Sequence, residues 1–168
     1  MSDQTLKNLK EAFAGESQAN RRYLAFAQKA DQDGFPNLAR LFRAIAQSET
    51  IHALNHLRIM GGVGPTADNV KEAWQGEKDE VNDMYPMFMD QANRDGNSEA
   101  LTTFSWANEA EKIHADFYEK ALAAAQKGED FQVGEVYVCA KCGYTVEGSA
   151  PDRCPLCGEP KERFERID

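Results

Sequence analysis

Apolar residues recur every three or four positions over four long stretches of the chain, the spacing of amphipathic helices. The stretches cover residues 3–31, 37–60, 69–94 and 98–127. Segments containing Gly, Pro or Asp separate them, and KGED (127–130) ends the last one. Four periodic helices joined by short loops predict an all-α four-helix bundle.

The helix boundaries carry local signals. Asp68 or Asn69 is a plausible N-cap for the third helix, and Ser98 for the fourth. Pro86 lies inside the third stretch and lacks an amide hydrogen. We therefore expect a kink or a local distortion in that helix.

The apolar faces of all four helices also carry ionisable residues near their middle. The face of the second helix that we expect to be buried contains Leu41, Ile45, Glu49 and His52. The matching positions of the other helices hold Glu16, Glu77, Glu80, Glu111 and His114. One such acid can reach solvent along a wide stripe, but several carboxylates in one core repel one another and resist ionisation. Since Lys and Arg are missing from these positions, we expect metal cations, and carboxylates with imidazoles suit iron, manganese or zinc.

Two Glu-x-x-His motifs, ETIH (49–52) and EKIH (111–114), sharpen this expectation. Residues at this spacing lie on one helical face, one turn apart. Ferritin-like di-iron bundles combine one Glu from each of two helices with Glu-x-x-His from each of the other two. Glu16 and Glu77 supply the single carboxylates, and Glu80 is one carboxylate beyond that set.

The chain changes character after residue 130, where Gly, Pro and short β-type runs surround two C-x-x-C pairs. The pairs are CAKC (139–142) and CPLC (154–157), and a Gly follows each of them. Such a Gly relieves the backbone where N–H groups approach sulfur. Four thiolates form a tetrahedral site for zinc or for one iron, and the spacing alone does not choose. A neighbouring di-iron site favours iron, because redox-inert zinc has no electrons to give.

Composition narrows the choice of partners. The formal net charge is −9 and no run of Lys or Arg is present, so nucleic acid and anionic membranes are poor candidates. No apolar run has membrane-spanning length, and none follows a positive N-terminal region as in a signal peptide. All four cysteines belong to metal-type pairs. We therefore expect a cytoplasmic protein.

Together these motifs resemble the rubrerythrin family. The similar segments are GESQANRRY (15–23), FRAIAQSETIH (42–52), GEKDEVNDMYP (76–86), EAEKIHADFYEKA (109–121) and the CAKCGY…CPLCG pair. The resemblance implies a ferritin-like domain over residues 1–130 and a rubredoxin-like β/loop metal domain over 134–168. It also implies a non-haem di-iron peroxidase that reduces hydrogen peroxide to water in oxidative-stress defence.

The resemblance further implies a role for each ligand. Glu49 and Glu111 look like bridging carboxylates, Glu16 like a terminal ligand of one iron, and Glu77 and His114 like terminal ligands of the other. Glu80 and His52 look like an exchangeable pair, in which Glu80 binds the first iron when oxidised and His52 replaces it when reduced. Ferric iron prefers a carboxylate, whereas the softer ferrous ion accepts a neutral imidazole.

Two tyrosines and the four cysteines complete the implied machinery. Tyr23 and Tyr85 match tyrosines near the di-iron site and are expected to hydrogen-bond ligand carboxylates. One iron would be held by Cys139, Cys142, Cys154 and Cys157, and would relay electrons to the di-iron site. No G-x-G-x-x-G motif is present, so the NAD(P)H-dependent reductase, or a rubredoxin acting as donor, is expected to be a separate protein.

Two alternative functions stay open. A ferroxidase or another iron-handling di-iron oxidase fits the same bundle but gives the four-cysteine iron no purpose. A non-enzymatic scaffold with zinc in its tail would be colourless.

The connection between the second and third helices, GGVGPTADN (61–69), is short for a ferritin-like bundle. Those two helices run parallel, so the connection has to descend about 28 Å, whereas nine residues reach at most about 30 Å fully extended. Its Gly-Gly and Gly-Pro pairs disfavour full extension. We therefore expect a domain-swapped homodimer, and the rival is a strained crossover within one chain.

Overall fold

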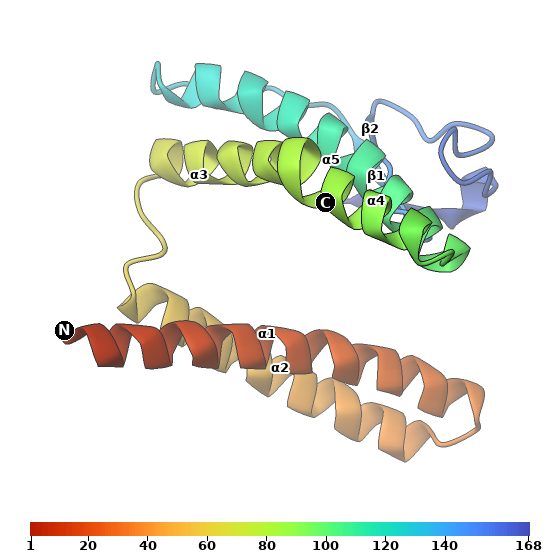
Figure 1. Ribbon diagram of the computed structural model, residues 1–168, viewed down its shortest axis with the longest axis horizontal. Helices are drawn as coiled ribbons and strands as arrows, with labels where there is room; N and C mark the ends of the chain where they lie inside the picture. Colours follow the sequence, from red (N-terminus) through yellow and green to blue (C-terminus); the bar gives the residue numbers. More distant parts are fainter. The chain divides into compact units, whose positions relative to one another are not determined.

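The structure is a computed structural model that describes residues 1–168, and the chain divides into two compact units, Met1–Gly64 and Pro65–Asp168. The first unit is a hairpin of two helices, α1 (Asp3–Gln32) and α2 (Pro36–Ile59) (Figure 1). The Ser2 hydroxyl caps α1 by accepting a hydrogen bond from the amide of Thr5. Pro36 opens α2, where a missing amide hydrogen costs little.

Small residues form the seam between α1 and α2. The buried positions are Ala27, Ala30, Ala39, Ala46 and Ala53. The large residues of α2 that we expected to be buried are exposed in the single chain, at 54% for Leu41 and 39% for Ile45. That expectation was wrong at the level of one chain, because a pair of helices can bury only the strip along which they touch. The rest of the apolar face of α2 remains uncovered within its own unit.

The second unit starts with three helical segments in succession. They are α3 (Thr66–Asp79), the π-helix η1 (Glu80–Met84) and α4 (Tyr85–Arg94), all of which pack on α5 (Ser98–Ala125) (Figure 1). The expected distortion near Pro86 is therefore confirmed as a π-helical turn. In it the Tyr85 amide bonds to the Glu80 carbonyl, five residues back.

Both N-cap predictions were wrong, the one for α3 by three or four residues and the one for α5 by one residue. Helix α3 begins at Thr66, directly after Pro65, so Asp68 lies inside the first turn, where its charge favours the helix N-terminus. Helix α5 is capped by Asn97, whose side chain accepts from the amide of Ala100. Ser98 is the first helical residue instead. Pro65, whose ring fixes φ, stands directly before α3, and the helix begins earlier in the chain than a cap at Asp68 or Asn69 would place it.

The chain ends in a small antiparallel sheet with strand order β2-β1-β3. The strands are β1 (Val136–Cys139), β2 (Thr145–Glu147) and β3 (Phe164–Ile167), and the 3₁₀ turn η2 (Lys161–Arg163) leads into β3. Cys139 is paired with Phe164 at the end of β1. Cys139 and Cys154 are the buried centre of this region. No helix of the protein combines the length and the hydropathy needed to cross a lipid bilayer.

Candidate metal centres

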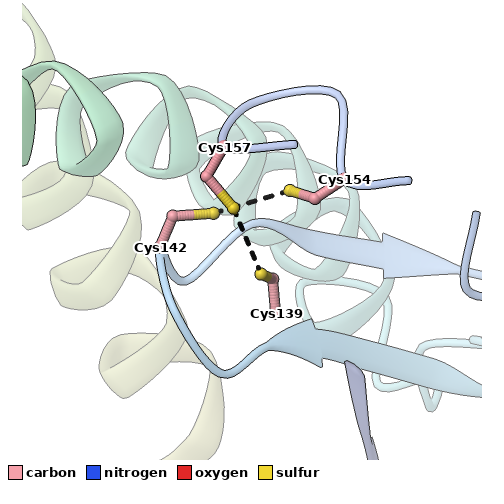
Figure 2. A group of neighbouring side chains, drawn as sticks. All are labelled: Cys139, Cys142, Cys154 and Cys157. Atoms are coloured by element: carbon pink, nitrogen blue, oxygen red, sulfur yellow. Dashed lines mark hydrogen bonds between the residues drawn. The ribbon is translucent and has the colours of Figure 1, made fainter. Parts of the chain in front are cut away.

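The four cysteines converge on one point, each pair contributed by its own loop (Figure 2). The Sγ atoms of Cys139 and Cys157 are 3.6 Å apart, as are those of Cys142 and Cys154. A disulfide would bring the sulfurs to about 2.05 Å. Thiolates bound about 2.3 Å from one ion at tetrahedral corners lie about 3.8 Å apart. The spacing thus fits a mononuclear four-cysteine metal site.

The loops around the cysteines are built to approach the sulfurs with backbone N–H groups. Gly143 and Gly158 follow the second cysteine of each pair and adopt φ of 79° and 76°. Burial tends to raise the pKa of Cys139, but backbone N–H groups of Lys141 and Cys142 bring its pKa below the ordinary value. The residues directly after these glycines, Tyr144 and Glu159, direct their backbone N–H groups at the sulfurs of Cys142 and Cys157, as expected from the predicted role of the glycines.

A first group of acidic and imidazole ligands forms within the hairpin of the first unit. Glu16 comes from α1, and Glu49 and His52 come from α2, with their candidate ligand atoms within 4.8 Å of one another. The Oε2 atom of Glu49 lies 3.0 Å from Nδ1 of His52. The Glu49 side chain is 16% exposed and that of His52 is 51% exposed.

A second group forms in the second unit with the same composition. Glu77 comes from α3, and Glu111 and His114 come from α5, again within 4.8 Å of one another. Nδ1 of His114 lies 2.5 Å from Oε2 of Glu111 and 3.7 Å from Oε2 of Glu77. All three side chains are at most 28% exposed.

The buried, closely spaced carboxyl groups of the second group favour binding of a cation. Burial, then the neighbouring carboxylates Glu111 and Glu80, raise the pKa of Glu77 to about 8. Its Oε2 atom is buried without a hydrogen-bond partner. Burial and Glu111 also raise the pKa of Glu80. A metal ion among these oxygens would satisfy the orphan atom and hold the acids ionised, so the donor set fits iron.

Glu80 and the two tyrosines border these groups. Glu80 is the first residue of the π-helix and interacts electrostatically with both Glu111 and His114. Burial and the charges of the neighbouring carboxylates raise the pKa of Tyr85. Tyr23 packs its ring against Phe26 and Phe42. The hydrogen bonds expected from the two tyrosines to ligand carboxylates stay a prediction.

One residue beside the second group was not predicted from the sequence. The Oγ1 atom of Thr145, at the start of β2, lies 2.9 Å from Nε2 of His114. The two residues are 31 positions apart, so no helical or strand periodicity links them. The only sequence signal is a hydroxyl residue close after a metal-binding C-x-x-C-G turn, which is too common to point to His114.

The two carboxylate–imidazole groups and the four-cysteine centre define a class: a ferritin-like di-iron protein with an added rubredoxin-like domain. Comparison with known protein families leads to the same class. The family model "Rubrerythrin" matches residues 7–122, and the model "Rubrerythrin, rubredoxin-like domain" matches residues 137–165. The chain belongs to the rubrerythrin family.

Individual relatives resemble the chain over nearly its whole length. Rubrerythrin-2 of Clostridium acetobutylicum is 39% identical, with 94% of this chain and 93% of the relative aligned. Nigerythrin of Nitratidesulfovibrio vulgaris is 34% identical over 95% of this chain and 85% of its own. A structure titled "Partially Reduced State of Nigerythrin" superposes with a TM-score of 0.55 at 33% identity, covering 99% of this chain and 88% of the other.

These findings confirm the family, the fold class and the iron cofactors predicted from the sequence. The protein has the ligands for a non-haem di-iron centre and for one iron bound by four cysteines.

Proposed function

We propose that the protein is a peroxidase that reduces hydrogen peroxide to water for defence against oxidative stress. The reaction is H₂O₂ + 2 e⁻ + 2 H⁺ → 2 H₂O. The observation that carries the proposal is the presence of a four-cysteine electron-transfer site in the same compact unit as Glu77, Glu111 and His114. Related nigerythrin structures bear titles that name mixed-valence and all-ferrous states, which supports redox cycling of such centres.

The proposed ligand roles follow the sequence prediction. Glu49 and Glu111 would bridge the metals, Glu16 would bind one, and Glu77 and His114 the other. A di-iron pair supplies two electrons and a concentrated positive charge that favours cleavage of the O–O bond. Glu80 and His52 would serve as alternative ligands of the first metal, and burial and Glu111 raise the pKa of Glu80.

Electrons would enter at the four-cysteine iron from a separate NAD(P)H-dependent reductase or from a rubredoxin. Cys142 and Cys157 are partly exposed, whereas Cys139 and Cys154 are buried. The exposed pair gives an external donor protein a short approach to the metal. The cytoplasm remains the predicted location.

Anaerobic stopped-flow spectroscopy tests this function. The iron-loaded, fully reduced protein is mixed with H₂O₂ or with O₂, and the visible bands of the oxidised four-cysteine iron are followed. The proposal predicts fast reoxidation by peroxide and slow reoxidation by O₂. Faster reaction with O₂ would favour a ferroxidase, and the absence of visible bands would indicate zinc and remove the electron relay.

We further propose that residues 1–130 form a ferritin-like bundle that is domain-swapped between two chains, with 134–168 as the rubredoxin-like domain. Each unit holds only one of the two carboxylate–imidazole groups. Each di-iron site would then take Glu16, Glu49 and His52 from one chain, and Glu77, Glu80, Glu111 and His114 from the other. The uncovered apolar face of α2, with Leu41 and Ile45, is the surface expected to be buried by the swap.

The observed helix ends strengthen the argument from length. Between Glu49 and Ile59 helix α2 rises about 15 Å, and between Thr66 and Glu77 helix α3 rises about 16 Å. If α2 and α3 ran parallel in one bundle with their acids level, the link would have to descend about 31 Å and step sideways by about 8–10 Å. The seven peptide units from Ile59 to Thr66 reach about 25 Å at most.

Lengthening residues 60–65 tests the swap. A flexible insertion of about ten Gly and Ser residues would allow the two units of one chain to pair. Light scattering should show a dimer for the natural protein and a substantial monomer fraction for the lengthened variant, both with full iron content. A natural protein that is already a monomer with full iron content would overturn the swap.

A further inference from the structure

The two ring nitrogens of His114 face different parts of the second unit. Nδ1 points toward the carboxylates of Glu111 and Glu77, at 2.5 and 3.7 Å. Nε2 lies 2.9 Å from the hydroxyl oxygen of Thr145. The imidazole is therefore held between a carboxylate pair on the helices and a hydroxyl on the rubredoxin-like sheet.

The hydrogen bonds of Thr145 determine which nitrogen of His114 carries the proton. Its hydroxyl has one hydrogen, which it donates to the carbonyl oxygen of Gly143 at 3.0 Å. With that hydrogen used, Oγ1 can only accept from His114, so Nε2 must be protonated. A neutral His114 then has its free lone pair on Nδ1, on the side where Glu77 and Glu111 lie.

The hydroxyl is itself held by the cysteine loop. Gly143 directly follows Cys142, and its amide donates to the carbonyl of Cys139 at 3.0 Å. Thr145 also begins β2, which pairs with β1 through Val138. The position of the hydroxyl is thus set by the turn that binds the four-cysteine metal.

We propose that Thr145 is a positioning residue for the di-iron centre, which fixes His114 in the Nε2–H tautomer and ties the cysteine loop to helix α5. The proposal rests on the proposed role of His114 as an iron ligand. A partner for the second ring N–H is a general requirement of metal-binding histidines, and its loss typically lowers metal affinity about 10- to 100-fold.

The first unit offers a matched control. His52 is also the histidine of a Glu-x-x-His motif, and its Nε2 has Ser48 Oγ as a neighbour at 3.5 Å. That distance is too long for a well-formed hydrogen bond to a hydroxyl. Ser48→Ala therefore removes a hydroxyl near a ligand histidine without removing a strong orienting contact.

The test uses the full chain labelled with ¹⁵N-histidine and loaded with zinc, which is diamagnetic. The protein has only three histidines, so their ring signals can be assigned by substitution. We expect the natural protein to show a slowly exchanging Nε2–H proton on His114. Thr145→Val keeps the branched shape and should lose that protection, with a fall of about 10- to 100-fold in zinc affinity at the di-metal site.

Two further variants decide how the result is interpreted. Thr145→Ser should restore both the protected proton and the affinity, while Ser48→Ala should change neither by more than about twofold. Thr145→Val with unchanged proton exchange and unchanged affinity would overturn the proposal. His114→Ala separates the two claims: if it binds zinc normally at the di-metal site, the ligand role itself fails, whereas a loss there with no effect of Thr145→Val defeats only the role of Thr145.

Discussion

The two Glu-x-x-His motifs of this protein are equal in sequence spacing and unequal in how their histidines are held. In the second unit, His114 is 28% exposed and contacts Glu111 on one side and Thr145 on the other. In the first unit, His52 is 51% exposed and has Glu49 at 3.0 Å and only a distant hydroxyl beyond it. A helical turn places both pairs, but the surroundings decide which imidazole is fixed.

This difference suits the separate roles proposed for the two histidines. A permanent ligand gains from a second hydrogen bond that orients its ring. A ligand that alternates with Glu80 has to leave the metal, and a weakly held, exposed ring can turn at little cost. The π-helix that begins at Glu80 adds to the contrast, since π-helical turns are frequent at functional sites.

Removing a proposed bridging carboxylate should have the largest effect on iron content, and the effect should be the same for either unit. Glu49→Ala and Glu111→Ala each delete a ligand proposed to contact both metals. We expect iron content to fall from about three to about one per chain. Metal analysis with visible spectroscopy checks this, because the four-cysteine bands should persist. Full di-iron occupancy in either variant would contradict the proposed ligand set.

Removing each histidine should expose the asymmetry. His114→Ala should lower di-iron affinity in both redox states, by more than the roughly 10- to 100-fold typical of losing an orienting partner. His52→Ala should leave ferric binding nearly unchanged, because Glu80 would occupy that position, and should weaken ferrous binding. Competition with chelators in each redox state measures this, and equal losses for both variants would argue against the exchange.

The sequence predicted the candidate ligands, but it did not predict the different surroundings of His52 and His114. The Glu-x-x-His spacing identified Glu111 with His114 because one helical turn suffices to bring them together. The C-x-x-C-G turns were predictable for the same reason. Thr145 was not, since its contact with His114 depends on how a sheet packs against α5.

Two features of the helices show the same limit of prediction from sequence. Pro86 correctly indicated a distortion, but its form, a π-helix over Glu80–Met84, depends on five-residue hydrogen bonds that no periodicity reveals. Leu41 was assigned to a buried face from its spacing, yet a single chain leaves it exposed. Sequence periodicity finds the apolar face of a helix but does not say what covers it.

The pH dependence of stability should differ between the metal-free and metal-loaded protein. Burial and neighbouring carboxylates raise the pKa of Glu77 from 4.5 to about 8. A raised acid pKa favours the protonated folded state, so the metal-free protein should lose stability as the pH rises from about 4.5 to about 8. The melting temperature should be lower at about pH 8 than at about pH 4.5, and Glu77→Gln should reduce that difference. A flat profile in the metal-free protein would contradict this account.

The smallest effect is expected in the first unit, where His52 is weakly held. Ser48→Ala removes the hydroxyl that lies 3.5 Å from Nε2 of His52. We expect the rate of reaction with peroxide to change by less than about twofold, because a contact of that length contributes little. A tenfold loss in stopped-flow experiments would mean that His52 is positioned as firmly as His114.

Complementation between two inactive variants tests the central claim, that two unequal half-sites from two chains form one di-iron centre. Chains carrying Glu49→Ala and Glu111→Ala are co-expressed with different tags, and the heterodimer is purified for iron analysis and peroxide turnover. In a swapped dimer one site receives both damaged residues and the other receives both intact ones, so we predict one complete di-iron site and about half of the natural activity. A heterodimer with no complete site and no activity would contradict the account.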